Sequence, residues 1–467
     1  MIKEYCGVVG AWGVPEAARV ACMGLYALQH RGEESAGIIV RKGAMLSGKV
    51  GMGVVSDVFR ERDLNALGGD AAIGHVRYST TGSSQSQNVQ PFLASTGKGQ
   101  IAVGHNGNLV NAVELHTKLV TSGAIFQTSM DTEILVHLFA QSYSRDPVES
   151  LVEALIPLRG AFSFVVLIQE ALIAVRDPQG FRPLCLGRLG DGHVVASETS
   201  AFDLIGAEYV RDVEPGEVLV ITSDGLRSLR PFPAAHHAYC IFEYIYFAKP
   251  DSRVYGHSVY ETRKRLGVAL AKEHPCDADF VSPIPDSGTF AAMGYAEESG
   301  MPFEMAVVRN HYIGRTFIQP TSERREQRVR LKLNPVRDVV AGKRVCVIED
   351  SIVRGTTSSA RVKTLREAGA KEVHMRVSCP PHRCPCFYGI DFPSSEELIA
   401  SSKSVEEIAS FIGLDSLGYL SHEAMLEAMP VAGEDFCTAC FNGEYPVPVD
   451  PQTGKLSLEA ACRSART

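Results

Sequence analysis

The sequence predicts two compact domains, an α+β domain followed by an α/β domain with a parallel sheet. Its 467 residues exceed one typical domain and suffice for two hydrophobic cores. Residues 345–348, VCVI, form the apolar run that a strand buried on both faces of a parallel sheet requires, and VKTLREAGAKEV downstream indicates the next helix. In the first half, the glycine-rich run from Cys6 and the segment DVEPGEVLVI indicate strands.

An acidic pair and a hydroxyl-rich loop follow the predicted strand, in the order VCVIEDSIVRGTTS. Glu349 and Asp350 fall where the strand should end, and ligands of parallel sheets bind at such ends. Two adjacent carboxylates can accept hydrogen bonds from ribose hydroxyls and hold a divalent cation. The N–H groups and hydroxyls after Gly355 suit a phosphate at a helix start. The pattern therefore predicts a site for a phosphorylated ribose; a solvated strand end with Thr356 or Thr357 as helix cap is the alternative.

This stretch resembles the phosphoribosyl pyrophosphate (PRPP) loop of type I phosphoribosyltransferases, although its acidic pair begins with Glu rather than Asp. The resemblance implies that Glu349 and Asp350 contact the ribose and, with Ser287 of VSPIPDSGTF, hold Mg²⁺. It also implies a lid that closes over PRPP, for which a solvated loop is the alternative. The implied phosphate and lid contacts are Arg354, Gly355, Thr356, Thr357, Arg315 and Lys332.

Composition and charge indicate which classes of binding partner to expect. The net charge is −8 and the pI is about 6.0, which argues against nonspecific nucleic-acid binding, because such binding needs a basic patch. The sequence has no apolar span of about 18 residues and no apolar signal segment near its start. We therefore expect a cytoplasmic protein without nucleic-acid or membrane partners.

Twelve cysteines in a cytoplasmic chain favour thiols, metal ligands or nucleophiles over disulfides. Cys6 lies so close to the start that removal of residues 1–5 would expose its α-amine. Because an α-amine titrates near about pH 8, it could serve as general base for the thiol of the same residue. The alternative is a structural cysteine buried on the first strand.

Four motifs after Cys6, LQHRGEESAGI, GHVRYST, GHNGNLVN and SMDTE, resemble class II, N-terminal-nucleophile glutamine amidotransferases. The resemblance implies a four-layer αββα sandwich with Cys6 as nucleophile. It also implies that Asn106 and Gly107 stabilise the oxyanion. Arg77 and Asp131 would bind the α-carboxylate and α-ammonium of glutamine. We expect the neighbouring histidines to be scaffold residues: His30, His75 and His105.

Together the two halves resemble glutamine PRPP amidotransferases, from Cys6 to about Pro446. The resemblance implies transfer of ammonia from glutamine to C1 of PRPP, which gives 5-phosphoribosylamine, glutamate and pyrophosphate as the first committed step of purine synthesis. It further implies inhibition by purine nucleotides and a homotetramer. The alternatives are another class II amidotransferase, such as glucosamine-6-phosphate synthase, and a noncatalytic regulator that senses PRPP.

The late cysteines extend the resemblance to an iron-sulfur branch of this family, which binds a [4Fe-4S] cluster. The implied ligands are one cysteine near the domain junction, one before FYGID and a late C-x-x-C pair: Cys240, Cys386, Cys437 and Cys440. Zinc is the alternative for the C-x-x-C pair. Cys379 and, in the CPC motif, Cys384 are the alternatives to Cys386, which is preferred because it directly precedes FYGID.

These motifs place the predicted domain boundaries. Residues 1–5 form a propeptide, 6–235 the amidotransferase domain, 236–430 the phosphoribosyltransferase domain, and 431–467 a C-terminal segment with cluster ligands. SSEELIASSKSVEEIASFIG indicates helices with serine caps. The last twenty residues lack strong periodicity, and we expect them to fray.

Overall fold

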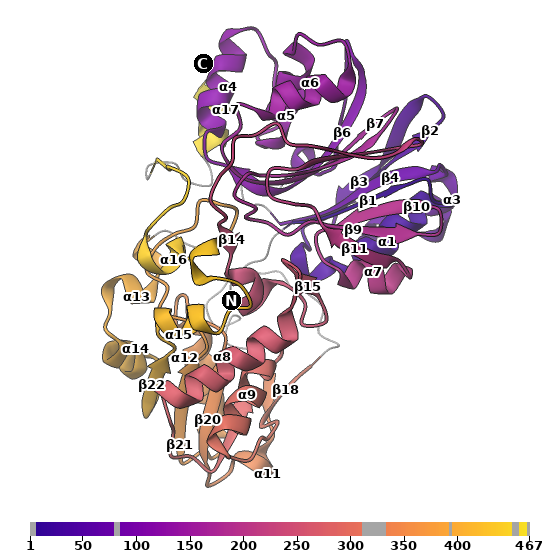
Figure 1. The fold of residues 1–467 in the computed structure, drawn as a ribbon. Coiled ribbons are helices and arrows are strands. Elements are labelled where there is room, and N and C mark those ends of the chain that lie inside the picture. Colours follow the sequence, from indigo (N-terminus) through magenta and orange to yellow (C-terminus); the bar gives the residue numbers. More distant parts are fainter. Residues whose placement is uncertain (1–5, 79–84, 311–332, 392–394, 451–456, 465–467) are drawn as a thin grey trace.

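The computed structural model of the chain describes residues 6–78, 85–310, 333–391, 395–450 and 457–464. Two bodies of secondary structure follow one another along the chain (Figure 1). The first holds two large antiparallel sheets, and the second holds a four-stranded parallel sheet.

The first sheet has seven antiparallel strands in the order β11-β9-β10-β1-β4-β2-β3. β1 and β4 are buried along their whole length, which explains their small and β-branched residues. β1 follows Cys6 directly and pairs with β4 on one side and β10 on the other. The strands are β1 (Gly7–Trp12), β2 (Ser35–Lys42), β3 (Met45–Met52), β4 (Ala71–Arg77), β9 (Cys185–Leu189), β10 (Gly192–Ala196) and β11 (Glu208–Asp212).

The second sheet has six antiparallel strands in the order β13-β12-β8-β7-β6-β5. β12 is the strand predicted from DVEPGEVLVI. β6 and β7 pair over nine residues. The strands are β5 (Phe92–Thr96), β6 (Gly99–Leu109), β7 (Gly160–Ile168), β8 (Leu172–Arg176), β12 (Val218–Thr222) and β13 (Gly225–Leu229).

The two sheets stack face to face, and helices cover both outer faces (Figure 1). An apolar cluster that includes Val8, Ile73, Val165 and Leu219 fills the space between the sheets. α1 and α7 pack on the first sheet, and α4, α5 and α6 pack on the second. The predicted αββα sandwich is therefore confirmed. The helices are α1 (Ala17–Ala27), α2 (Val55–Val58), α3 (Glu61–Leu67), α4 (Ala112–Thr121), α5 (Thr132–Gln141), α6 (Pro147–Leu155) and α7 (Ser200–Ile205).

The second half centres on a parallel sheet in the order β17-β20-β21-β22, as predicted. β20 is the strand expected from VCVI, and α12 is the helix expected after it. Because the strands are parallel, their carboxyl ends meet at one edge of the sheet. The main elements are β17 (Phe280–Pro283), β20 (Arg344–Glu349), β21 (Glu372–Val377), β22 (Ser416–Tyr419), α8 (Val259–Glu273), α9 (Thr289–Ser299), α12 (Thr356–Glu367), α14 (Val405–Ile412) and α15 (His422–Glu427).

Short elements join the two halves. β14 (Tyr239–Cys240) pairs in parallel with β23 (Phe436–Cys437), and a π-helix, η3 (Glu243–Phe247), leads into the second half. Among the helices of the described residues, none is long and apolar enough to span a membrane. The other short elements include β15 (Arg253–Val254), β16 (His257–Ser258), β18 (Val307–Arg309), β19 (Leu333–Pro335), α11 (Arg337–Val340), α13 (Ile399–Ser402) and α16 (Ala439–Asn442).

The helix ends show one prediction that is confirmed and one that is wrong. Ser404 caps α14: its hydroxyl accepts a hydrogen bond from the Glu407 N–H, and the Glu407 carboxylate accepts one from the Ser404 N–H. The expected fraying at the C-terminus is wrong for Ser457–Ser464, which form α17 beside α4 of the first half (Figure 1). Leu458 is buried there. So short a helix depends on tertiary packing, which local periodicity does not report.

Candidate active sites

Cys6 lies at the entry to β1, beside the end of β4. Gly7 pairs with Val76 across these strands, which places Cys6 next to Arg77. Both side chains are buried. The Cys6 thiol donates a hydrogen bond to the carbonyl of Tyr78, with 3.4 Å between Sγ and O. The fold thus brings together the predicted nucleophile and the predicted carboxylate-binding arginine.

Burial dominates the electrostatics around Cys6. It raises the pKa of the thiol to about 11, despite the hydrogen bond to Tyr78 and the nearby Arg77 guanidinium. Burial also lowers the pKa of Arg77, although Cys6, Glu34 and Asp131 act in the opposite direction. A thiol with such a pKa is protonated at neutral pH, so its reaction as a nucleophile requires a general base.

Asn106 and Gly107 lie on β6, which contacts β1 and β4 of the facing sheet. A Cβ atom at Gly104 would point toward Val8 and His75 of that sheet. Since alternate residues of a strand share a face, the Asn106 side chain lies on the same face. Its amide nitrogen and oxygen are buried and have no hydrogen-bond partner among the described residues. Because an unpaired buried amide costs free energy, this one is suited to a polar ligand.

Asp131 lies at the start of α5 and is fixed by two neighbours. Its Oδ2 accepts a hydrogen bond from the Leu109 N–H at 3.0 Å, and its Oδ1 lies 3.3 Å from His105 Nδ1. Burial opposes the charge, but the His105 ring and backbone N–H groups outweigh it and lower the pKa of Asp131. The His105 ring therefore orients the Asp131 carboxylate in its charged form. We call the predicted glutamine residues the Cys6 site: Cys6, Arg77, Asn106, Gly107 and Asp131.

Two contacts that the sequence did not reveal border the Cys6 site. Buried Arg31 donates from Nε to the carbonyl of Cys6 at 3.2 Å. The Tyr78 hydroxyl donates to Asp391 Oδ2 at 3.4 Å, so a segment of the second half reaches this site. The first contact joins residues 25 positions apart. No local signal marks the second, because it joins residues 313 positions apart.

The predicted cation ligands meet at the carboxyl edge of the parallel sheet. Ser287, in the loop after β17, donates a hydrogen bond to Asp350, which directly follows β20. Ser351 donates to the other carboxylate oxygen of Asp350. The Ile284 N–H donates to the Ile348 carbonyl at 2.8 Å, which ties the start of the Ser287 loop to β20. The fold thus places Ser287 against one member of the acidic pair.

Glu349 is buried between the parallel sheet and α12. Arg361, from α12, forms an ion pair with its carboxylate. Burial nevertheless raises the pKa of Glu349 to about 7, and the charge of Asp350 adds to the rise. A carboxyl that titrates near neutrality at a strand end is a candidate ligand, because a bound cation would favour its charged form.

α12 begins at the loop predicted to hold a phosphate. Gly355 has φ of +72°, and a Cβ atom there would meet side chains of α13 and α14 at 2.8 and 3.1 Å. The N-cap residue, Gly355, offers no side-chain cap, so the N–H groups of Thr356 and Thr357 suit an anion. The Arg354 side chain pairs instead with Glu397 at 2.7 Å. The predicted lid contacts lie outside the described residues: Arg315 and Lys332.

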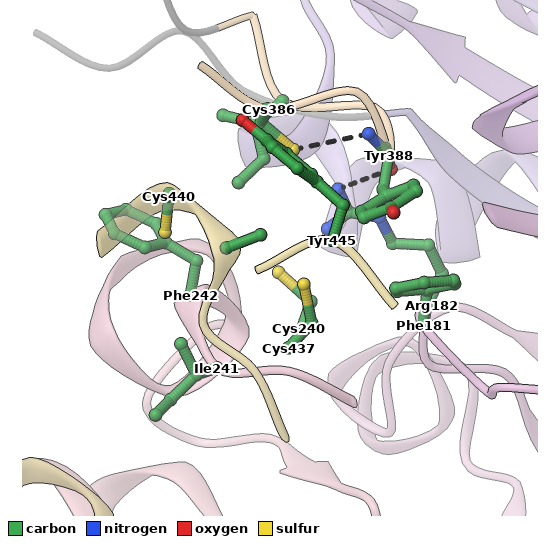
Figure 2. A pocket seen from close by; sticks show the side chains of 12 residues that line it. Phe181, Arg182, Cys240, Ile241, Phe242, Cys386, Tyr388, Cys437, Cys440 and Tyr445 are labelled. Atoms are coloured by element: carbon green, nitrogen blue, oxygen red, sulfur yellow. Dashed lines mark hydrogen bonds between the residues drawn. The ribbon is translucent and has the colours of Figure 1, made fainter. Parts of the chain in front are cut away.

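Four cysteines line one cavity of about 20 Å³ at the junction of the two halves (Figure 2): Cys240, Cys386, Cys437 and Cys440. The other walls are mainly apolar and aromatic side chains. Parallel pairing of β14 with β23 sets Cys240 opposite Cys437. In the CPC motif, Cys386 lines the cavity, whereas a Cβ atom at Gly443 would lie 3.3 Å from the Cys384 sulfur.

The chemistry of this four-cysteine cavity fits a group that binds thiolates. Burial raises the pKa of all four thiols, to about 11 for Cys240, so thiolates there need a compensating positive charge. The Tyr388 N–H donates to Cys386 Sγ at 3.4 Å, and backbone N–H groups also approach Cys240 and Cys437. Such N–H···S bonds are typical of iron-sulfur sites. Within the described ranges, no three His, Cys, Asp or Glu side chains are grouped so that they could hold one metal ion.

Known proteins match both halves of the chain. Residues 75–204 match the glutamine amidotransferase domain family. Amidophosphoribosyltransferase 1, chloroplastic, of Arabidopsis thaliana is 53% identical over 95% of this chain and 79% of its own length. Amidophosphoribosyltransferase of Bacillus subtilis (strain 168) is 48% identical over 97% of this chain and 96% of its own length. A solved structure of the B. subtilis glutamine PRPP amidotransferase, complexed with ADP and GMP, has a TM-score of 0.91 at 48% identity, and the match covers 96% of this chain and 99% of that chain.

The similarity continues from the glutaminase sandwich through the phosphoribosyltransferase sheet. It therefore favours a coupled enzyme over the two alternatives, another class II amidotransferase and a noncatalytic regulator. With about half of all residues identical over nearly its whole length, the chain belongs to the amidophosphoribosyltransferase family.

Proposed function

We propose that the Cys6 site releases ammonia from glutamine and that the edge of the parallel sheet uses this ammonia on PRPP. The overall reaction gives 5-phosphoribosylamine, glutamate and pyrophosphate and is the first committed step of purine biosynthesis. The observation that carries the glutamine step of this proposal is the Asn106 amide, buried without a partner in the described residues on the face of β6 that meets the first sheet.

This function is tested by product release from anaerobically purified protein with glutamine, PRPP and Mg²⁺. We expect equal amounts of glutamate and pyrophosphate. The amount of each product should fall when glutamine or PRPP is omitted. Glutamate released without pyrophosphate would identify a different acceptor for the ammonia. Release of neither product, by protein that has lost residues 1–5 and carries its cluster, would favour a regulator.

The glutamine half-reaction begins at the Cys6 thiol. Removal of residues 1–5, which lie outside the described part of the chain, would free the α-amine to accept the thiol proton. The sulfur then attacks the carboxamide carbon, and the Asn106 amide and Gly107 N–H donate to the oxyanion. The protonated amine passes its proton to the departing ammonia. Water then hydrolyses the thioester to glutamate and the free thiol.

Arg77 and Asp131 select glutamine by its charged amino-acid end. Arg77 would clamp the α-carboxylate through two N–H donors, and Asp131 would pair with the α-ammonium. The lowered pKa of Asp131 supports this role, because the residue is an anion at neutral pH.

PRPP occupies the carboxyl edge of the parallel sheet in this proposal. Glu349 and Asp350 accept hydrogen bonds from the ribose hydroxyls. Together with Ser287 they would hold Mg²⁺, whose charge stabilises the leaving pyrophosphate. The contact between Ser287 and Asp350 supports this grouping.

The 5-phosphate would bind at the start of α12. The backbone N–H groups there and the threonine hydroxyls are its donors, and the positive end of the helix dipole favours the anion. Arg354 contributes through its backbone, since its side chain pairs with Glu397. The proposed phosphate contacts are Arg354, Gly355, Thr356 and Thr357, and the proposed lid contacts are Arg315 and Lys332.

A [4Fe-4S] cluster in the four-cysteine cavity is the proposed second cofactor, with a structural role. Its ligands would tie β14 to the C-terminal segment through Cys240, Cys386, Cys437 and Cys440. The lining of one cavity by four cysteines supports a cluster, because four thiolates are the ligand set of a [4Fe-4S] cluster.

The cluster is tested by the metal content of anaerobically purified protein. We expect about four iron and four sulfide per chain. Cys437→Ser should lose this iron and lower the unfolding temperature, since it removes one of four ligands. Cys384→Ser is the matched control and should keep the iron. One zinc per chain, with no sulfide, would contradict the proposal.

Regulation, assembly and location complete the proposal. Purine nucleotides would inhibit, which the ADP and GMP in the B. subtilis structure support. We further propose a homotetramer in the cytoplasm, although the A. thaliana relative is chloroplastic by name. The domain boundaries near residues 235 and 430 remain a proposal: the sandwich ends with β13 at Leu229, and the parallel sheet begins with β17 at Phe280.

A further inference from the structure

The second half supplies part of the wall around the proposed oxyanion site. Gly389 lies directly against Gly107: a Cβ atom at Gly389 would lie 3.0, 3.1 and 3.3 Å from the C, O and Cα atoms of Gly107. On its other side, a Cβ atom at Gly107 would lie 2.0 Å from the carbonyl oxygen of Ala161 in β7. The Gly107 backbone is therefore enclosed between β7 and residues 386–391, which we call the 386–391 segment.

The 386–391 segment is anchored on both sides of this contact. Asn108 Nδ2, next to Gly107, donates to the Phe387 carbonyl at 2.8 Å. Arg182 Nη2 donates to the Tyr388 carbonyl at 3.1 Å. The Tyr388 ring stacks on Phe181 with 4.3 Å between centroids. These contacts hold the segment on the sandwich with little freedom to retreat from Gly107.

One buried ion network joins the 386–391 segment to the backbone of the nucleophile. Besides the Tyr388 carbonyl, Arg182 contacts Glu243 at 3.1 Å. Glu243 pairs with Arg31 at 2.7 Å, and Arg31 donates to the Cys6 carbonyl at 3.2 Å. All three charged side chains are buried. The separation of Cys6 and Gly107 matters for the oxyanion. Both are thus connected to the 386–391 segment, Gly107 by direct contact and Cys6 through this ion network.

We propose that Asn108 and Gly389 are positioning residues for the glutamine half-reaction: they hold Gly107 where its N–H meets the oxyanion that forms on attack by Cys6. The inference rests on the proposed function. Stabilisation by a fixed donor depends steeply on distance, because the donor must lie about 3 Å from the oxyanion rather than from the ground-state carbonyl. A shift of a few tenths of an ångström should therefore weaken the transition state more than glutamine binding.

Gly389→Ala is the first test, since its methyl group would press on the Gly107 backbone. We expect kcat with glutamine to fall about tenfold and the KM for glutamine to change less than about threefold. The rate with ammonia in place of glutamine should stay within roughly twofold. Gly300→Ala is the matched control: Gly300 also has positive φ, at +71°, but a Cβ atom there meets no atom within 4 Å. It should leave both rates unchanged.

Asn108→Ala is the second test and adds no backbone strain. It should lower kcat with glutamine in the same direction, because the 386–391 segment loses its anchor beside Gly107. An aldehyde analogue of glutamine, which forms a tetrahedral adduct with a thiol, should bind both variants more weakly by a larger factor than the change in KM. If Gly389→Ala does not fold, Asn108→Ala and this analogue decide the question.

Several outcomes would overturn the inference. Unchanged kcat with glutamine in both variants would show that Gly107 needs no such support. Equal losses with glutamine and ammonia would show a general structural role. Cys6→Ala, measured beside them, separates failure of this inference from failure of the proposed function. If Cys6→Ala retained glutamine-dependent synthesis, the proposed function itself would fail.

Discussion

Replacement of Cys6 by alanine is expected to abolish glutamine-dependent synthesis of 5-phosphoribosylamine and to spare synthesis from free ammonia. The thiol forms the covalent intermediate, and loss of such a nucleophile lowers kcat by about 10⁴-fold or more. Ammonia in solution bypasses the Cys6 site, so its rate should stay within roughly twofold of the parent enzyme. The measurement is pyrophosphate release at saturating PRPP with each nitrogen source.

Cys22→Ala is the control for Cys6→Ala. Cys22 is also buried, on α1, and burial raises its pKa to about 11 as well. It differs in its surroundings, because the charges that influence its pKa are those of Arg19 and Glu61, whereas Arg77, Glu34 and Asp131 influence that of Cys6. It should therefore keep both activities. Loss of both activities in Cys6→Ala, at an unchanged unfolding temperature, would contradict the division between two sites.

The sequence revealed those parts of the fold that short-range pattern specifies. The apolar run before Glu349 predicted β20, and the threonines after Gly355 predicted the start of α12. The serine caps predicted within residues 394–413 include that of α14, which Ser404 provides. In each case a short window of the sequence contains the pattern that indicates the element, although β20 itself pairs with the distant strands β17 and β21.

Contacts between distant segments could not be predicted in this way. The resemblance placed Arg354 at the phosphate, but its side chain pairs with Glu397. Arg361 pairs with Glu349, but its partner could not be predicted from its place in the sequence or from its charge. The contact of Gly389 with Gly107 joins the two halves of the chain. Such pairs follow from how the sheets and helices are stacked, and no local periodicity carries that information.

The parallel-sheet edge should respond differently from the Cys6 site. We expect Asp350→Asn to lower the glutamine-dependent and ammonia-dependent rates together, each by about 100-fold, because both reactions use PRPP and Mg²⁺. The substitution keeps the shape of the side chain but removes its charge. It also leaves one acceptor oxygen for Ser287 and Ser351, which donate to different oxygens of the carboxylate. Initial rates at increasing Mg²⁺ should show a higher requirement in the variant.

Asp338→Asn, at an exposed position of α11, is the matched control and should change neither rate. The ratio of the two rates is the informative quantity. Cys6→Ala should change this ratio by orders of magnitude, whereas Asp350→Asn should leave it near the parent value while both rates fall. A loss confined to the glutamine-dependent rate in Asp350→Asn would assign the residue to ammonia delivery instead of PRPP binding. The two variants together therefore separate the nucleophile from the acceptor site without a bound ligand.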